Sequence, residues 1–294
     1  MTERKPKPDP HPQHQPHAEP RADPIRRSAS SDAVSEVLAA QRAYEERRST
    51  RFGRGAERLT APLGGAFAKL VPPEALRAAL RGADTFAGMT LAEVTAHDIS
   101  DLDACEAAAM RVQAWAMGSN AATGAASGWF GAAGMTADIP ATIALAARTV
   151  RATGCAYGFA ESSDEEAAFR LMILEAATMQ AEEGRAETLS NLNKMAEWLT
   201  TPQGRLVMEK GGEWLTEKVI ERVARHLGVS LAGRKAGQVV PIVGGAVAAV
   251  VNASFQTDIA RAARYGYRQR WLMSRQLLAA PVSASAAAPA GDPV

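Results

Sequence analysis

The strongest constraint on the fold of this chain is a long stretch without charged side chains, from Val112 to Ala137, which glycines interrupt repeatedly. Glycine lacks a Cβ atom, so it lets two backbones approach closely, but inside a helix each glycine costs about 1 kcal/mol relative to alanine. Such a run therefore needs a compensating gain, which close helix–helix contact or a hairpin would supply. The glycines are Gly118, Gly124, Gly128, Gly131 and Gly134.

The segment after this run has the features of a helix start. Asp138 has a carboxylate that suits an N-cap, and Pro140 is tolerated in a first turn. We therefore expect a helix from Asp138 that stops at Gly154. No strand is expected before the glycines and no lysine lies among them, which argues against a phosphate-binding loop. We expect a close-packed turn or hairpin that contacts the second glycine-bearing stretch, Pro241–Asn252.

Composition favours an all-α fold. Alanine and glycine are abundant and aromatic residues make up only 5% of the chain, which suits closely packed helices better than β-sheets. We expect one helical domain at 34–278, between disordered tails at 1–33 and 279–294 that are too poor in large apolar residues to fold. Its helices are expected at about 33–48, 59–71, 74–81, 90–98, 101–117, 138–154, after Ser162 or Ser163, and at 188–199, 213–227 and 239–278.

The cysteines and histidines do not suggest a metal site. Cys105 and Cys155 lie far apart among small and apolar residues, so we expect buried, reduced thiols. His97 stands beside acidic residues at an expected helix end, and the histidines near the N-terminus are interleaved with prolines. We expect no metal and no cofactor.

The C-terminal apolar stretch, from Val239 to Asn252, is shorter than the roughly 20 residues that cross a bilayer, so we expect a buried or re-entrant helix. The N-terminus lacks the apolar core of a secretory signal, and we expect a cytoplasmic location. Beyond Asn252 the helix should continue with aromatic residues among arginines, a composition typical of a membrane surface. The candidate membrane-surface residues are Arg261, Arg264, Arg268 and Trp271.

A second basic run, from Arg42 to Arg58, follows the first expected helix. Cations suit the C-terminal end of a helix dipole, and the same run could rest on an anionic membrane surface. Over the whole chain, 33 basic and 32 acidic residues leave a net charge of +1, which gives no global field for nucleic acid.

Two ordered motifs carry a family resemblance. The first joins the glycine run to the next helix and ends at a Tyr-Gly pair before an acidic helix start, and the second opens the C-terminal helix. The motif residues are Gly131, Gly134, Asp138, Pro140, Tyr157, Gly158, Pro241, Gly244 and Asn252.

These motifs resemble those of the EcsC family of bacterial proteins, and the likeness covers roughly residues 60–275. The resemblance implies an α-helical, cytosolic or membrane-peripheral protein. The family is named for its association with an ABC-transporter operon, so an inner-membrane transporter component is one expected partner and an anionic membrane surface is the other. The resemblance implies no reaction.

Three functions fit these features. The first is an interaction protein that docks at the inner membrane, although a small-residue core with a solvated arginine face would show the same pattern. The second is a carboxylate- or metal-dependent hydrolase centred on Asp138, with Glu165, Glu166 and Asp258 as further acids, although HExxH, GxSxG and GxxxxGK[ST] are absent. The third, nucleic-acid binding by the arginine-bearing helix, lacks a basic surrounding surface, so we expect no nucleic-acid partner.

Overall fold

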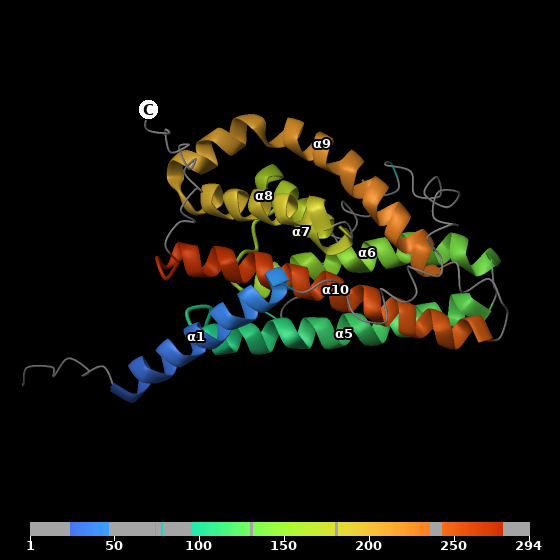
Figure 1. The fold of residues 1–294 in the computed structure, drawn as a ribbon, viewed down its shortest axis with the longest axis horizontal. Helices are drawn as coiled ribbons and strands as arrows, with labels where there is room; N and C mark the ends of the chain where they lie inside the picture. Colours follow the sequence, from blue (N-terminus) through green and yellow to red (C-terminus); the bar gives the residue numbers. More distant parts are fainter. Residues whose placement is uncertain are drawn as a thin grey trace, which may run out of the picture.

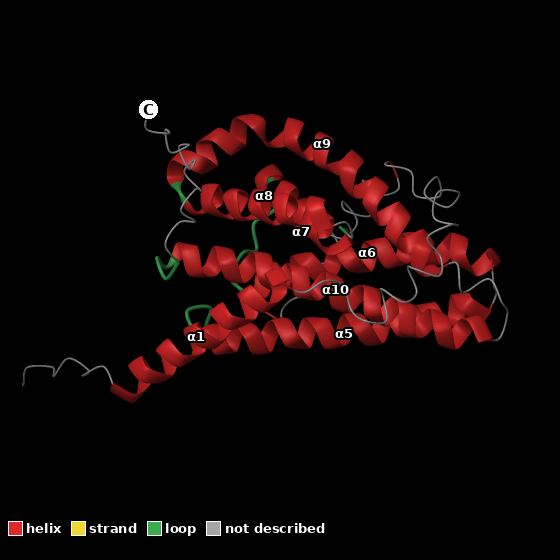
Figure 2. Cartoon of the chain, in the orientation of Figure 1, coloured by secondary structure: helices red, strands yellow, loops and turns green. Residues whose placement is uncertain are grey.

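The computed structural model describes residues 24–46, 74, 78, 94, 96–129, 132–179, 182–235 and 243–278. These ranges contain α-helices and no strand (Figures 1 and 2), which confirms the expected all-α fold for the described part of the chain. The helices are α1 (Pro24–Glu46), α5 (Leu102–Trp129), α6 (Ala132–Ala156), α7 (Asp164–Thr178), α8 (Glu182–Thr200), α9 (Pro202–Lys235) and α10 (Val243–Ser274).

Helix α10 is the centre of the bundle and packs against α5, α6, α7 and α8. In Figure 1, α5 runs along one side of α10, while α7, α8 and α9 lie on the other side. Small residues make the close packing possible: Ala262 and Ala263 are fully buried, and a Cβ at Gly266 would lie 3.1 Å from Ile173. None of the described helices is long and apolar enough to cross a membrane.

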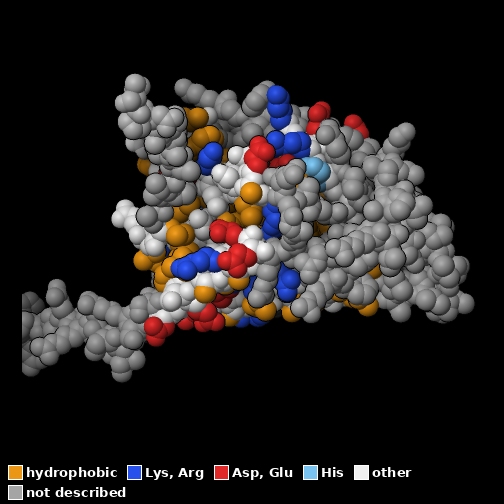
Figure 3. Space-filling view, in the orientation of Figure 1, with side chains coloured by type: hydrophobic (Ala, Val, Ile, Leu, Met, Phe, Trp, Pro, Cys, Tyr) orange, Lys and Arg blue, Asp and Glu red, His pale blue; other side chains and the backbone are white. Residues whose placement is uncertain are grey.

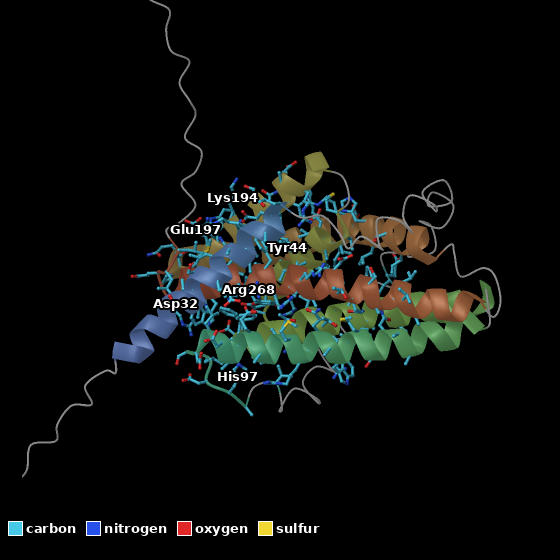
Figure 4. All side chains as sticks on the ribbon, turned by 60° about the horizontal axis from the view of Figure 1, so that its bottom comes forward. Asp32, Tyr44, His97, Lys194, Glu197 and Arg268 are labelled. Carbon is cyan, nitrogen blue, oxygen red and sulfur yellow. The ribbon has the colours of Figure 1, made fainter. Side chains whose placement is uncertain are left out.

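Helices α5 and α10 run antiparallel. At one end the side-chain amide of Asn120 donates to the carbonyl oxygen of Asn252 at 2.8 Å, and at the other end Glu106 pairs with Arg268. Asn120 belongs to the uncharged run and Asn252 to the second glycine-bearing stretch. Their hydrogen bond confirms that the two stretches touch, and Figures 1 and 4 show the helices continuing side by side beyond it.

The uncharged run forms a helical hairpin. Helix α5 continues to Trp129 and α6 begins at Ala132, so Gly128 and Gly134 lie inside helices, and Gly131 lies outside the described residues. The prediction that the helix starts at Asp138 is wrong, because the alanines before it are strong helix formers and extend α6 upstream. Asp138 is therefore not the N-cap of α6, and Pro140 lies within the helix rather than in its first turn.

Helix α6 ends at Ala156, two residues before Gly158, and not at the predicted Gly154. The Phe159 N–H donates to the Gly154 carbonyl at 2.8 Å and the Gly158 N–H donates to the Cys155 carbonyl at 3.0 Å, the two bonds of a Schellman motif. Gly158 has φ +86°, which glycine adopts most easily. Gly154 instead packs inside α6, where an added Cβ would lie 2.6 Å from the ring of Tyr267.

Local capping signals located two other boundaries. Ser163 caps α7 by accepting the Glu166 N–H, and acidic residues fill the first turn as expected. The expected break after Thr200 is confirmed, since Thr201 alone separates α8 from α9.

Several other boundaries were wrong. Helix α8 begins at Glu182 and not at 188, and α9 begins at Pro202 and not at 213. Helix α9 continues past Gly228 to Lys235, because buried residues such as Leu231 offset the cost of the glycine. Helix α1 begins at Pro24, so residues 24–33 are helical rather than disordered, and Pro24 itself suits a first helical position. The structure leaves undescribed the helix expected at 59–71 and, apart from residues 74 and 78, the helix expected at 74–81. It also leaves undescribed the two chain ends, 1–23 and 279–294.

Candidate functional site

Helix α10 is unusual for a central helix because many of its buried side chains are polar. A buried polar group is costly unless it is hydrogen bonded, so such a helix depends on partners from its neighbours. These partners come from α1, α5, α6 and α7, and they define the candidate site. The buried polar residues of α10 are Asn252, Gln256, Thr257, Asp258, Gln269 and Arg270.

The innermost pair joins Arg270 to Glu166 at the start of α7. Two hydrogen bonds of 2.5 and 2.7 Å form a bidentate contact, and the two side chains are 1% and 3% exposed. The guanidinium lies 4.1 Å from the ring centroid of Phe159 and 5.6 Å from that of Phe169. Glu166, a candidate carboxylate for hydrolysis, is thus held in a structural ion pair.

A second charged cluster lies between α5, α6 and α10. Arg268 makes two hydrogen bonds to Glu106, and the Tyr157 hydroxyl donates to the same carboxylate. Burial and the nearby Glu106 raise the pKa of Tyr157 well above its ordinary value, so the phenol stays protonated. Burial alone would lower the pKa of Arg268, but the hydrogen bonds to Glu106 raise it. Tyr157, a family-motif residue, therefore links the three helices.

These contacts correct two of the four membrane-surface residues. The side chain of Arg268, labelled in Figure 4, is only 12% exposed and is paired with Glu106. Trp271 is 3% exposed, and its indole N–H donates to the Ile99 carbonyl at 3.0 Å. Tertiary packing covers both side chains, so neither is free on the surface. Arg261 is exposed and Arg264 is partly exposed.

Helix α1 is docked on α10 through polar groups. The Gln41 amide donates to the Tyr265 carbonyl at 3.0 Å and to the Gln269 side chain at 3.1 Å. Tyr44 stacks on Tyr265 with ring centroids 4.8 Å apart (Figure 4 labels Tyr44). The Tyr265 hydroxyl in turn donates to Glu45 at 2.7 Å. This network fixes α1 at a specific position on the bundle.

One face of α5 points away from the bundle and is apolar, with arginines at both edges. Met110 is 46% exposed and Trp115 is 50% exposed. The guanidinium of Arg264, from α10, donates to the Met110 sulfur at 2.6 Å, and that of Arg148, from α6, lies 3.8 Å from the Trp115 ring centroid. Arg111 is exposed on the same helix. We call these five residues the α5 face, and Figure 3 shows hydrophobic and basic side chains along the lower edge, where Figure 1 places α5.

The predicted family-motif residues do not form one cluster. Tyr157 and Gly158 lie together at the end of α6, and Asn252 lies on α10 against Asn120. Pro140 is exposed within α6. Gly244 belongs to the first turn of α10, whereas Pro241 lies outside the described residues, as does the side chain of Asp138.

The cysteines and His97 take part in the packing and hydrogen bonding of the bundle. Cys105 and Cys155 are buried thiols outside any disulfide, as expected, and burial raises the pKa of the Cys105 thiol to about 11. His97 makes a 2.8 Å hydrogen bond between its Nε2 and the Ala156 carbonyl at the end of α6. The described residues contain no group of three or more His, Cys, Asp or Glu side chains that could hold a metal ion.

Sequence reasoning missed Glu106, Met110, Arg148 and Arg270. A charged residue within an apolar helical stripe is a signal for a buried ion pair, and Arg270 beside Trp271 and Leu272 has that context. Met110 and Arg148 gave no comparable signal, because their proximity to Arg264 and Trp115 depends on how three helices pack.

Fold and site together define the class of this protein: an all-α bundle around a polar central helix, with its buried carboxylate–arginine pairs serving the packing. The chain belongs to the EcsC protein family, whose model matches residues 32–272. Neither the curated proteins nor the solved structures gave a match. The matched region begins within α1, so α1 and the basic run after it belong to the family region, and the expected lower limit of about residue 60 is wrong.

Proposed function

We propose that this protein is a membrane-peripheral interaction protein that docks on an anionic membrane through the α5 face. The observation that carries the proposal is the pairing of exposed apolar side chains with arginines. Met110 and Trp115 are about half exposed, and Arg264 and Arg148 lie directly on them. A tryptophan flanked by arginines is the composition of a membrane interface.

The distribution of charge along α5 also supports docking of the α5 face on an anionic membrane. The helix carries acidic residues near its start, at Asp103 and Glu106, and none from Ala107 to Trp129. Glu106 is already neutralised by Arg268. From Ala107 to Ala122, the exposed residues of α5 are therefore apolar or basic, which suits an anionic surface and not a cationic one.

Magnitudes indicate that docking needs both components. Removing a side chain the size of Met from water contributes about 1.5–3 kcal/mol, and each arginine near an anionic surface contributes about 1 kcal/mol. The two apolar side chains and the three arginines therefore contribute comparable free energies to membrane binding. Because the electrostatic part is screened, binding should weaken as salt increases.

Flotation of the full chain with vesicles tests the proposal. We expect it to float with vesicles of phosphatidylcholine and phosphatidylglycerol at low salt, and not with phosphatidylcholine alone. The double variant Met110→Ser/Trp115→Ser should lose flotation. The matched control is Leu206→Ser/Val207→Ser on α9, where the side chains are 60% and 65% exposed, and it should float like the wild type. Absence of flotation by the wild type at low salt would refute the proposal.

A further inference from the structure

Arg264 differs from Arg268 and Arg270, which follow it on α10, because no carboxylate among the described residues binds its guanidinium. Its Nη1 donates to the Met110 sulfur, a weak and uncharged acceptor. Its Nε is buried without a hydrogen-bond acceptor, as is the Nε of Arg270. Within the described part of the chain, the thioether is the only hydrogen-bond acceptor that this guanidinium has. The remaining Nη donors of the guanidinium have no acceptor among the described residues and could bind a ligand.

The neighbouring carboxylate does not satisfy Arg264. Glu106 lies one turn before Met110 on α5, but Arg268 takes both of its oxygens and the Tyr157 hydroxyl donates to it as well. Arg264 and Arg268 thus lie side by side at the seam between α5 and α10, with one carboxylate between them. That carboxylate is bound bidentately by only one of the two.

Electrostatics favour an added anion at this position. Burial and the nearby Arg268 lower the pKa of Arg264, which shows that the local environment opposes its positive charge. Arg261, one turn earlier on α10, is exposed and adds to the positive potential. An anion beside Arg264 would offset both the desolvation and the repulsion. A phosphate group suits this position, because its oxygens match the planar fork of a guanidinium.

We propose that Arg264, assisted by Arg261, forms a phosphate-binding site at the seam of α5 and α10, and that its ligand is the phosphate group of an anionic lipid. The proposal rests on the proposed membrane docking, and it specifies which part of the lipid is recognised. Met110, beside the guanidinium, would enter the acyl boundary while Arg264 holds the headgroup. The site would thereby fix the orientation of α5 on the membrane.

Two substitutions separate a shaped site from general charge. Arg264→Gln removes the charge, and Arg264→Lys keeps it but removes the bidentate fork. We expect both to weaken binding to phosphatidylglycerol-containing vesicles, by roughly tenfold or more for Gln and by several-fold for Lys. The control is Arg205→Gln on α9, whose side chain is 52% exposed and which should bind like the wild type. Thermal unfolding checks that each variant remains folded.

A soluble probe gives an independent measurement on the same site. Titration of the full chain with glycerol 1-phosphate, followed by the NMR signal of the Arg264 Nε–H, should shift that signal in the wild type. Inorganic phosphate should shift it less, if at all, since the proposed ligand is a lipid headgroup. The Arg264→Gln chain should lose the corresponding heat in calorimetry.

The outcomes are distinguishable. If the wild type does not float with anionic vesicles, the proposed function fails, and binding of soluble phosphate alone would then overturn the lipid assignment. If the wild type floats and Arg264→Gln floats equally well, the phosphate site is refuted although docking stands. If Arg264→Lys binds vesicles like the wild type, the effect is one of charge only, and the shaped site is refuted.

Discussion

Arg264 and Arg270 belong to the same helix and have the same side chain, but their surroundings are opposite. Arg270 is 1% exposed at its side chain, binds Glu166 bidentately and lies against two phenylalanine rings. Arg264 is partly exposed and donates to a thioether. The Arg270 guanidinium is already bound by a carboxylate, whereas the Arg264 guanidinium can gain a hydrogen-bond acceptor. Burial on α10 thus separates arginines that hold the fold from those available for binding.

The largest effect should come from the inner arginine. Arg270→Gln leaves Glu166 as a buried carboxylate without its cation, which we expect to lower the free energy of unfolding by about 3–5 kcal/mol. Chemical denaturation followed by circular dichroism measures the change. The double variant Arg270→Met/Glu166→Leu should recover much of the loss, because no buried charge remains. Wild-type stability of the single variant would show that the inner pair is not required.

Arg268 should give an intermediate result. Its side chain is 12% exposed, compared with 1% for Arg270. Arg268→Gln leaves the partly buried Glu106 with the Tyr157 hydroxyl as its remaining side-chain partner in this cluster. We expect a loss of about 1–3 kcal/mol in the same denaturation experiment. A loss as large as that of Arg270→Gln would mean that the solvent exposure of these arginines does not determine how much each contributes to the free energy of unfolding.

A further ion pair predicts how stability depends on pH. Glu175 on α7 pairs with the half-exposed Arg222 on α9 at 3.1 Å. Burial raises the pKa of Glu175 above the unfolded value near about 4.3, and Arg222 partly opposes the rise. Because the folded state binds the proton more tightly, this contribution to stability is complete below the unfolded pKa and is lost as pH rises through the folded pKa.

The unfolding free energy of the wild type relative to Glu175→Gln should therefore increase as pH falls through this acidic window. Parallel denaturation series for the two proteins between neutral and acidic pH measure the difference. An unchanged difference across the series would show that Glu175 has the same pKa in both states.

The smallest stability effect should come from the outer arginine. Arg264→Gln removes no ion pair within the described residues, so we expect its free energy of unfolding to remain within about 0.5 kcal/mol of the wild type. The same variant should lose vesicle binding, so stability and binding would separate at this residue. A large loss of stability would place Arg264 with Arg270 as a structural residue.

Local signals predicted the elements whose ends depend on neighbouring residues. Ser163 and the acids after it predicted the start of α7, and the Thr-Thr-Pro sequence predicted the break between α8 and α9. The same kind of signal failed at Asp138 and Gly228. At Asp138 the preceding alanines extended α6, and at Gly228 buried residues farther along held α9 together. Capping residues are informative only where the flanking residues do not favour continuing the helix.

The candidate site was predictable only in part. Arg264 was identified from its place among aromatic residues on a predicted helix, but Trp271 and Arg268 had the same signal and are covered in the structure. Periodicity assigns residues to a face of one helix, and it does not say which face another helix will cover. The partners Met110 and Arg148 come from two other helices, so no pattern within α10 could indicate them.

The sequence by itself determined that this chain is helical and that it carries the EcsC motifs, because composition, spacing and helix propensity act locally. The predicted contact between its two glycine-bearing stretches, at residues 132 positions apart, depended on tertiary packing. Tertiary structure alone decided which charges are buried in pairs. Arg270 and Glu166 are 104 positions apart, and Arg268 and Glu106 are 162 apart. An ion pair depends on two surfaces meeting in space, and only the packing of α10 against its neighbours specifies that meeting.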